Sequence, residues 1–230
     1  MSDAATWRPV ADAIALPNPV VTINRRGRTP SGPLGDDYSL RTEIEDLHHV
    51  LDSLGTPADL FGWSYGGLIA LEVAVDRPEL RSLTAYEPVC APFAPAAIPA
   101  VRAAIERGDP DGAVRLVNTD VSGFSAEYVE ALRQSPVWEV LRPLTAPLAD
   151  ELAAIDAHIP SWDRYRTPAS PVTLLLGELN PGGEPYGAAF DRIAAALPQA
   201  RVELLPGQGH LAHAEAPELL ADRIAAAAAR

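Results

Sequence analysis

The feature that most constrains the fold is the segment Gly62-Trp63-Ser64-Tyr65-Gly66, in which a serine stands between glycines. Residues 58–61 before it suit a short strand, and residues 68–75 after it read as a helix. A tight strand-to-helix turn needs glycine on both sides, because a Cβ there collides with neighbouring backbone. The pattern predicts a nucleophile elbow, with the Ser64 hydroxyl above the sheet and the Tyr65 amide beside it as an oxyanion donor.

A second candidate for catalysis lies near the C-terminus. Residues 201–205 read as a strand, and a glycine-rich turn leads from it to His210, ahead of a closing helix over residues 216–229. A histidine in the loop after the final strand follows the order that this architecture requires, so His210 is the predicted general base. No cluster of cysteines or carboxylates at ligand spacing accompanies His213, so no metal site is predicted. The remaining histidines are interpreted as solvated or structural: His48, His49 and His158.

With these two motifs, the chain resembles the α/β-hydrolase family from about residue 7 to its end. Four further segments carry the resemblance: residues 20–28, 38–54, 83–88 and 172–178. It implies an α/β fold with a mostly parallel sheet flanked by helices, N-terminally reduced, in which residues 20–24 form the strand that precedes the elbow by one helix. It also implies a hydrolase core of residues 1–90 and 168–230, interrupted by a helical lid over residues 91–167.

The expected lid shows helical periodicity in four runs: residues 98–107, 111–117, 126–134 and 148–157. A lid of this kind excludes water from the nucleophile and supplies apolar contacts to a substrate. The aromatic residues predicted to line the pocket are Trp63 beside the serine and, from the lid and its return, Phe93, Phe124, Trp138 and Trp162. Packing in the core is the alternative interpretation for each of them.

The identity of the catalytic acid is left open by the residues. The family commonly places it two residues after a Gly-Glu pair, where this chain has Asn180. An asparagine can orient an imidazole, but it does not stabilise an imidazolium. Glu87, at the end of the strand expected next to the serine strand, is the first choice, followed by Glu184 in a glycine-rich loop and then Asn180. The alternative interpretation of Glu87 is a turn cap before Pro88.

The N-terminus departs from the family pattern. Family members normally begin with two or three strands and a His-Gly loop that supplies the second oxyanion donor, and neither precedes residue 20 here. Residues 1–7 resemble the stretch that follows such a loop. We therefore expect Met1 to be an internal methionine of a longer reading frame; the alternative is a reduced sheet with an altered oxyanion site.

Composition narrows the partners and the chemistry. A formal net charge of −13 opposes binding to nucleic acid or to an anionic membrane, and favours a neutral small-molecule substrate. All 18 basic residues are arginine, which excludes a Schiff-base lysine and a P-loop lysine, and no dinucleotide fingerprint appears, so no cofactor is predicted. A single cysteine, Cys90, and the lack of a leader pattern indicate a cytoplasmic location. Nothing in the sequence indicates an oligomeric state.

The combined prediction is a cofactor-independent serine hydrolase that cleaves an ester, lactone or thioester of a small, largely apolar molecule. Ser64, His210 and Glu87 or Asn180 would carry the reaction. The alternative is a lyase, a cyclase or a carbon–carbon bond hydrolase in the same pocket, motivated by the altered acid motif and the absent His-Gly loop. A further alternative is a truncated, inactive product, because a missing central strand leaves strand edges unpaired.

Overall fold

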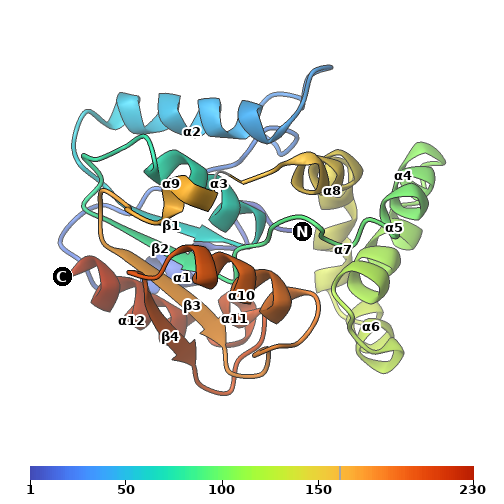
Figure 1. Cartoon of the computed structure of the whole chain (residues 1–230). Coiled ribbons are helices and arrows are strands. Elements are labelled where there is room, and N and C mark those ends of the chain that lie inside the picture. Colours follow the sequence, from blue (N-terminus) through green and yellow to red (C-terminus); the bar gives the residue numbers. More distant parts are fainter. Residues whose placement is uncertain (161) are drawn as a thin grey trace.

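A computed structural model describes residues 1–160 and 162–230. Four strands form one parallel sheet in the order β1-β2-β3-β4 (Figure 1). Their bounds are β1 Asp59–Trp63, β2 Ser82–Tyr86, β3 Val172–Gly177 and β4 Arg201–Leu205. Trp63 pairs with Tyr86 and Gly177 pairs with Leu205, so the carboxyl ends of neighbouring strands lie level. The loops that leave these ends therefore meet at one edge of the sheet, as expected for a parallel α/β fold.

Helices cover both faces of the sheet, because the strand side chains alternate between two apolar clusters. On one face, Leu174 and Leu176 of β3 pack with α3 (Tyr65–Ala74) and α10 (Tyr186–Ala196). On the other face, Leu175 packs with α1 (Arg8–Ala13) and α12 (Pro217–Ala228). The remaining elements near the sheet are α2 (Leu40–Leu54), which contacts α3, and the short α11 (Ala212–Glu215), which precedes α12.

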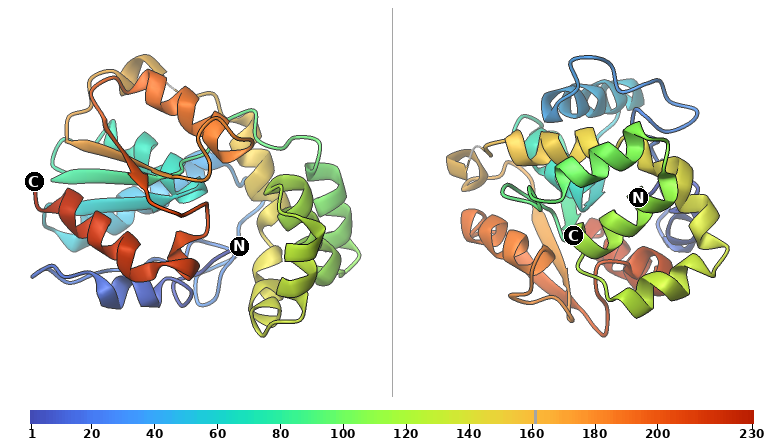
Figure 2. Two further views of the ribbon diagram at one scale, coloured as in Figure 1. Left: turned by 90° about the horizontal axis from the view of Figure 1, so that it is seen from below. Right: turned by 90° about the vertical axis from the view of Figure 1, so that its right-hand side faces the viewer.

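The segment between β2 and β3 is helical. Its elements are α4 (Ile98–Glu106), α5 (Pro110–Leu116), the π-helix η1 (Val117–Val121), α6 (Ala126–Arg133), α7 (Val137–Leu141), the 3₁₀-helix η2 (Arg142–Thr145), α8 (Leu148–Ala157) and α9 (Trp162–Tyr165). The four predicted helical runs are confirmed by α4, α5, α6 and α8. Figures 1 and 2 show that α4 to α8 gather beyond one end of the sheet.

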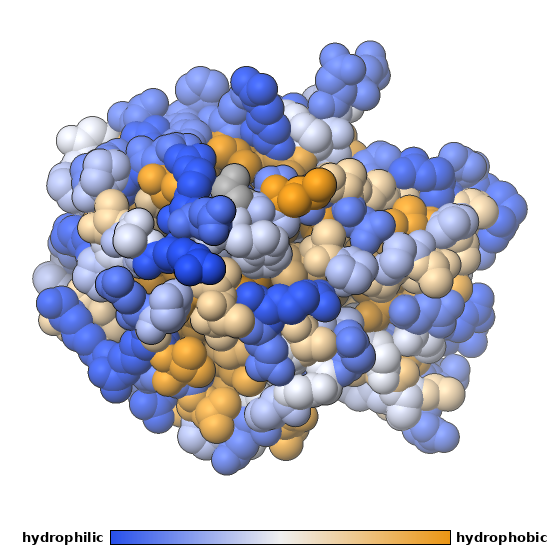
Figure 3. Space-filling view, viewed as in Figure 1, coloured by the Kyte–Doolittle hydropathy of each residue, from blue (hydrophilic) through white to orange (hydrophobic). Residues whose placement is uncertain are grey.

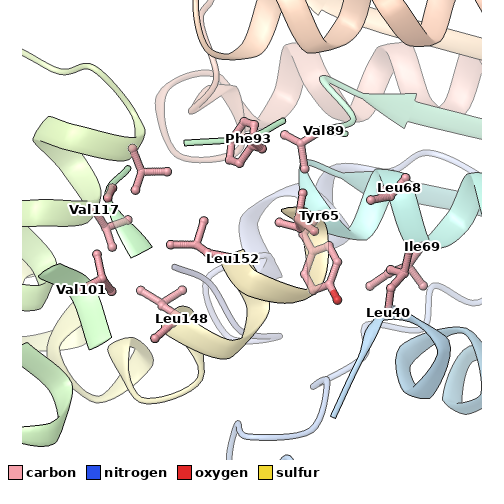
Figure 4. Close-up of a cluster of buried hydrophobic side chains, with 14 of the residues drawn as sticks. Leu40, Tyr65, Leu68, Ile69, Val89, Phe93, Val101, Val117, Leu148 and Leu152 are labelled. Carbon is pink, nitrogen blue, oxygen red and sulfur yellow. The ribbon is translucent and has the colours of Figure 1, made fainter. Parts of the chain in front are cut away.

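One apolar cluster joins this helical segment to the sheet layer. Tyr65 at the start of α3 packs with Leu148 and Leu152 of α8 and with Phe93, which follows β2 (Figure 4). The same cluster includes Val117 of η1. The helical segment therefore packs against the residues next to Ser64, and this packing helps to hold those residues in position.

The prediction of a strand at residues 20–24 is wrong. This stretch has no strand pairing, and Val20 and Val21 are 43% and 56% exposed. A strand requires a hydrogen-bonding neighbour, and none of the four strands of the sheet pairs with these residues, which line a groove together with residues of β1. Asn24 is held by local bonds instead: its side chain accepts from the Ala4 amide at 2.8 Å, and its carbonyl accepts from the Ser31 hydroxyl at 2.6 Å.

The surface carries few large apolar side chains. In Figure 3 hydrophilic residues cover much of the visible face, and apolar residues form small groups between them. Exposed apolar residues include Val202 and Leu204 of β4. Apolar surface residues that are scattered in this way are ordinary in folded proteins. Among residues 1–160 and 162–230, no helix is both long enough and apolar enough to cross a lipid bilayer.

Candidate active site

Ser64 occupies a strained turn between β1 and α3. Its φ of 55° lies in the left-handed region, which non-glycine residues rarely adopt. A Cβ on Gly62 would lie 2.4 Å from the Gly66 carbonyl oxygen, and one on Gly67 would lie 2.9 Å from Pro88. A Cβ on Gly66 would meet nothing within 4 Å. The close approach that demands glycine is therefore at positions 62 and 67, which corrects the expectation that both glycines flanking the serine motif are crowded.

The helix that follows the serine begins with Tyr65. Because N–H groups in the first turn of a helix have no intrahelical acceptor, the Tyr65 amide is free of helix bonding beside the Ser64 hydroxyl. The Tyr65 side chain turns into the protein and is 6% exposed. Its hydroxyl accepts a bond from Tyr38 at 3.3 Å, and the Arg25 guanidinium lies 4.8 Å from its ring centre. These contacts hold the start of α3 in place.

His210 and Glu87 form a buried pair. Nδ1 of His210 lies 2.7 Å from Oε2 of Glu87, and their side chains are 4% and 0% exposed. Burial lowers the pKa of His210, and the bond to Glu87 opposes that shift. The imidazole is therefore uncharged near neutral pH. With Nδ1–H donating to the carboxylate, the lone pair is on Nε2, where a general base needs it.

The other carboxylate oxygen of Glu87 accepts two further bonds. Oε1 receives the Gly177 amide and the Asn180 side-chain amide, each at 2.8 Å. Asn180 therefore contacts the carboxylate and not the imidazole, while Glu184 is exposed on its loop. Of the three candidate acids named from the sequence, Glu87 alone is recorded in contact with His210 among the described residues.

Two aromatic rings enclose the imidazole of His210. The Tyr186 ring is stacked on it with centres 3.5 Å apart and planes 10° apart. The Trp63 ring lies 4.7 Å away on a tilted plane, and its Nε1 donates to the His210 carbonyl at 2.9 Å. Sequence reasoning singled out Trp63 but missed Tyr186, because nothing local marks the first residue of α10 as a neighbour of a histidine 24 positions later.

Ser64 and His210 line the same groove, whose volume is about 1200 Å³. Trp63, Phe93 and Phe124 also line it. Residues 59–62 of β1 and residues 20–23 also line it. This groove is large enough to enclose a small organic molecule.

Trp138 and Trp162 lie outside the groove, in contrast to the prediction. Trp138 is 4% exposed, packs with Val114 and Val129, and donates from Nε1 to Asp111. Trp162 packs edge-on against Tyr165, in the apolar layer between the sheet and α10. Their aromatic side chains and their place in the lid region predicted that they line the pocket, but both pack in the protein interior instead. The core interpretation is the correct one for these two residues.

Comparisons with known proteins identify the family and the fold. The model of the family described as "Alpha/beta hydrolase family" matches residues 2–223. An alpha/beta hydrolase from Sphaerobacter thermophilus superposes with a TM-score of 0.83 at 26% identity, over 98% of this chain and 88% of that one.

Two curated relatives are similar in sequence. A putative 2-succinyl-6-hydroxy-2,4-cyclohexadiene-1-carboxylate synthase of Bacillus subtilis is 26% identical over 84% of this chain and 74% of its own length. The polyketide synthase ThaQ of Burkholderia thailandensis is 26% identical over 92% of this chain, which spans only 11% of that protein. The family match covers nearly the whole chain, and the chain therefore belongs to the alpha/beta hydrolase family of enzymes.

Proposed function

We propose that the chain is a serine hydrolase that cleaves the ester, lactone or thioester bond of a small, largely apolar molecule. Ser64 is the nucleophile, His210 the general base and Glu87 the acid. The observation that carries the proposal is the buried Glu87–His210 pair, 2.7 Å apart, at the groove that Ser64 also lines. A carboxylate that holds Nδ1–H selects the imidazole tautomer that can take a serine proton.

These positions support the following reaction. Ser64 Oγ attacks the substrate carbonyl carbon while its proton passes to Nε2 of His210, and Glu87 stabilises the imidazolium. The Tyr65 amide donates to the oxyanion. Collapse of the tetrahedral intermediate breaks the bond to the alcohol or thiol, which takes the proton from His210. Water then attacks the acyl-enzyme by the same route and releases the acid.

The helical segment of residues 91–167 serves as a lid on a core of residues 1–90 and 168–230. Its contribution to the groove includes the apolar residues Val117, Val121 and Phe124, beside a smaller number of polar ones such as Asn118 and Ser122. An apolar wall binds uncharged acyl or leaving groups by excluding water from them. The net charge of −13 adds a general repulsion toward anions. The chemistry of the three side chains needs no cofactor.

Covalent labelling tests the proposal. A fluorophosphonate probe should add one adduct to the wild-type protein by intact mass, at Ser64. The variants Ser64→Ala and His210→Ala should not be labelled and should not hydrolyse p-nitrophenyl acyl esters. Ser135→Ala is the matched control, since the Ser135 hydroxyl donates to the Leu132 carbonyl within the helical segment. A folded wild-type protein that stays unlabelled contradicts the assignment of Ser64.

A second candidate is a lyase or cyclase that uses the same serine and histidine in proton transfer. The similarity to the putative synthase of Bacillus subtilis favours it. The two candidates differ in the covalent intermediate, because elimination across a carbon–carbon bond forms no acyl-enzyme. Rapid-quench mass spectrometry after the protein is mixed with an ester separates them. An acyl adduct on Ser64 supports the hydrolase. The absence of both the adduct and ester turnover supports the lyase.

A further inference from the structure

Tyr186 contacts both the proposed general base and the helical segment. Its ring lies parallel to the His210 imidazole, with centres 3.5 Å apart. At the other end of the same side chain, the hydroxyl donates to Oγ of Ser122 at 2.9 Å. Ser122 is the residue that caps η1. A single buried side chain therefore joins a histidine near the C-terminus to an element of the segment inserted between β2 and β3.

The element at the far end of this contact forms part of the groove. Val117, Val121 and Ser122 itself are in its wall. A π-helix is an uncommon conformation that is enriched at functional sites, and η1 is the turn at which the α5 helix widens before it ends. A molecule bound in the groove would therefore press on the residues that hold the Tyr186 hydroxyl.

The position of the Tyr186 ring matters for the chemistry of His210. Tyr186 is stacked on the imidazole and the Trp63 ring lies 4.7 Å from it, so both rings take up space next to His210 that water would otherwise fill. Burial is the main cause that lowers the pKa of His210. Burial also raises the pKa of the Tyr186 phenol, which therefore stays protonated and remains a hydrogen-bond donor. The degree to which the imidazole is dehydrated depends on how firmly this ring is held.

We propose that Tyr186 is a positioning residue that couples η1 to the general base: its bond to Ser122 holds the ring against His210 and keeps water from the imidazole. The inference rests on the proposed function for the role of His210. The coupling means that His210 has the pKa needed of a general base only when residues 117–122 keep their present position in the wall of the groove. A substrate that fits beside η1 leaves the bond between Tyr186 and Ser122 intact.

The test removes the bond from either end while leaving the stacked ring in place. Tyr186→Phe and Ser122→Ala, singly and together, are compared with the wild type by NMR titration of the His210 imidazole, which is assigned with His210→Gln. A loosened ring admits water, so the pKa of His210 should rise by roughly 0.3–1 unit in each single variant. The double variant should show the same rise and no more, and kcat/KM at pH 7 should fall about two- to tenfold in all three.

Two matched controls remove a hydroxyl elsewhere in the helical segment. Tyr128→Phe alters a partly exposed tyrosine of α6, and Ser135→Ala removes a hydroxyl that donates to the Leu132 carbonyl. Both should leave the pKa of His210 unchanged. A merely structural bond would lower the Tm of Tyr186→Phe and Ser122→Ala without moving that pKa, and this result overturns the coupling.

Rises in pKa that add in the double variant also overturn it, because they show that the two hydroxyls act independently. The outcome is separable from the proposed function. If Ser64→Ala keeps full activity, the hydrolase mechanism fails, whereas the NMR titration still reports whether Tyr186 and Ser122 act together on His210.

Discussion

Replacement of Glu87 by glutamine is the sharpest test of the site, because it removes a charge with little change in shape. Oε1 of Glu87 accepts two N–H donors, from Gly177 and Asn180, and Oε2 accepts from Nδ1 of His210. The single oxygen of a glutamine should remain with the two donors, since the alternative places an NH₂ group against both of them. The NH₂ group then faces Nδ1, which must become an acceptor. His210 is driven to the tautomer with its proton on Nε2.

That tautomer cannot take the Ser64 proton, and the imidazolium that forms during turnover loses its carboxylate partner. We expect kcat to fall by about 10²–10⁴, equivalent to about 3–5.5 kcal/mol of transition-state stabilisation. The fold should persist, because the substitution is nearly isosteric and the Gly177 backbone amide and the Asn180 side-chain amide keep their acceptor. Unfolding by urea should therefore show a transition as cooperative as that of the wild type.

The assay combines kcat on a p-nitrophenyl acyl ester with ¹⁵N NMR of the His210 ring, which reports the tautomer. Glu178→Gln is the matched control, since Glu178 is a neighbouring carboxylate that accepts from the Gly207 amide at 2.7 Å. It should retain nearly wild-type kcat. Wild-type turnover in Glu87→Gln, with the tautomer reversed, would refute the reasoning and return the acid to Asn180 or Glu184.

Three further predictions follow from the same contacts. kcat/KM should increase with pH as His210 loses its proton, with an apparent pKa below the ordinary histidine value of about 6.5, because burial lowers that pKa; a pH profile centred above 7 contradicts this. His213 is buried, and burial lowers its pKa to about 3 in the folded protein. Between pH 6.5 and 3 this imidazole therefore binds a proton in the unfolded state that it does not bind in the folded state. The free energy of unfolding should therefore fall as pH falls through that window, by at most about 1.4 kcal/mol per pH unit, and urea unfolding at pH 5 and 7 should show a smaller difference in His213→Phe than in the wild type. Gly62→Ala should lower the free energy of unfolding by more than about 1 kcal/mol, because its Cβ would lie 2.4 Å from the Gly66 carbonyl oxygen, whereas Gly66→Ala, whose Cβ meets nothing, should cost less; equal Tm values in these two variants would contradict the packing of the elbow.

Much of the architecture could be predicted because it depends on local chemistry. The strand at residues 201–205 and the helix that follows the serine were predicted from local sequence, because the apolar segments and glycine-rich turns that bound these elements lie within a few residues. The order of serine and histidine along the chain, with the glycine-rich turns ahead of each, identified Ser64 and His210 as candidates. These signals need only neighbours a few residues away, so one sequence suffices to find them.

The acid could not be predicted in the same way. Glu87, Asn180 and Glu184 are each plausible by type, and the choice among them depends on distances across three strands. Parallel pairing of β2 with β3 brings the end of β2 beside the Gly177 amide, and only this juxtaposition puts the Glu87 carboxylate 2.7 Å from His210. Asn180 then becomes a donor to the carboxylate.

The sequence by itself determined the class of fold, the turn that carries Ser64 and the loop that carries His210, since propensity, periodicity and glycine conformations act locally. Tertiary structure alone decided which carboxylate contacts the imidazole, that Tyr186 and Trp63 pack beside it, that Trp138 is in the core, and that residues 20–24 form no paired strand. The physical reason is the same in each case. A hydrogen bond, a stacked ring or a strand ladder needs a partner from a distant part of the chain, and its presence depends on how the elements pack.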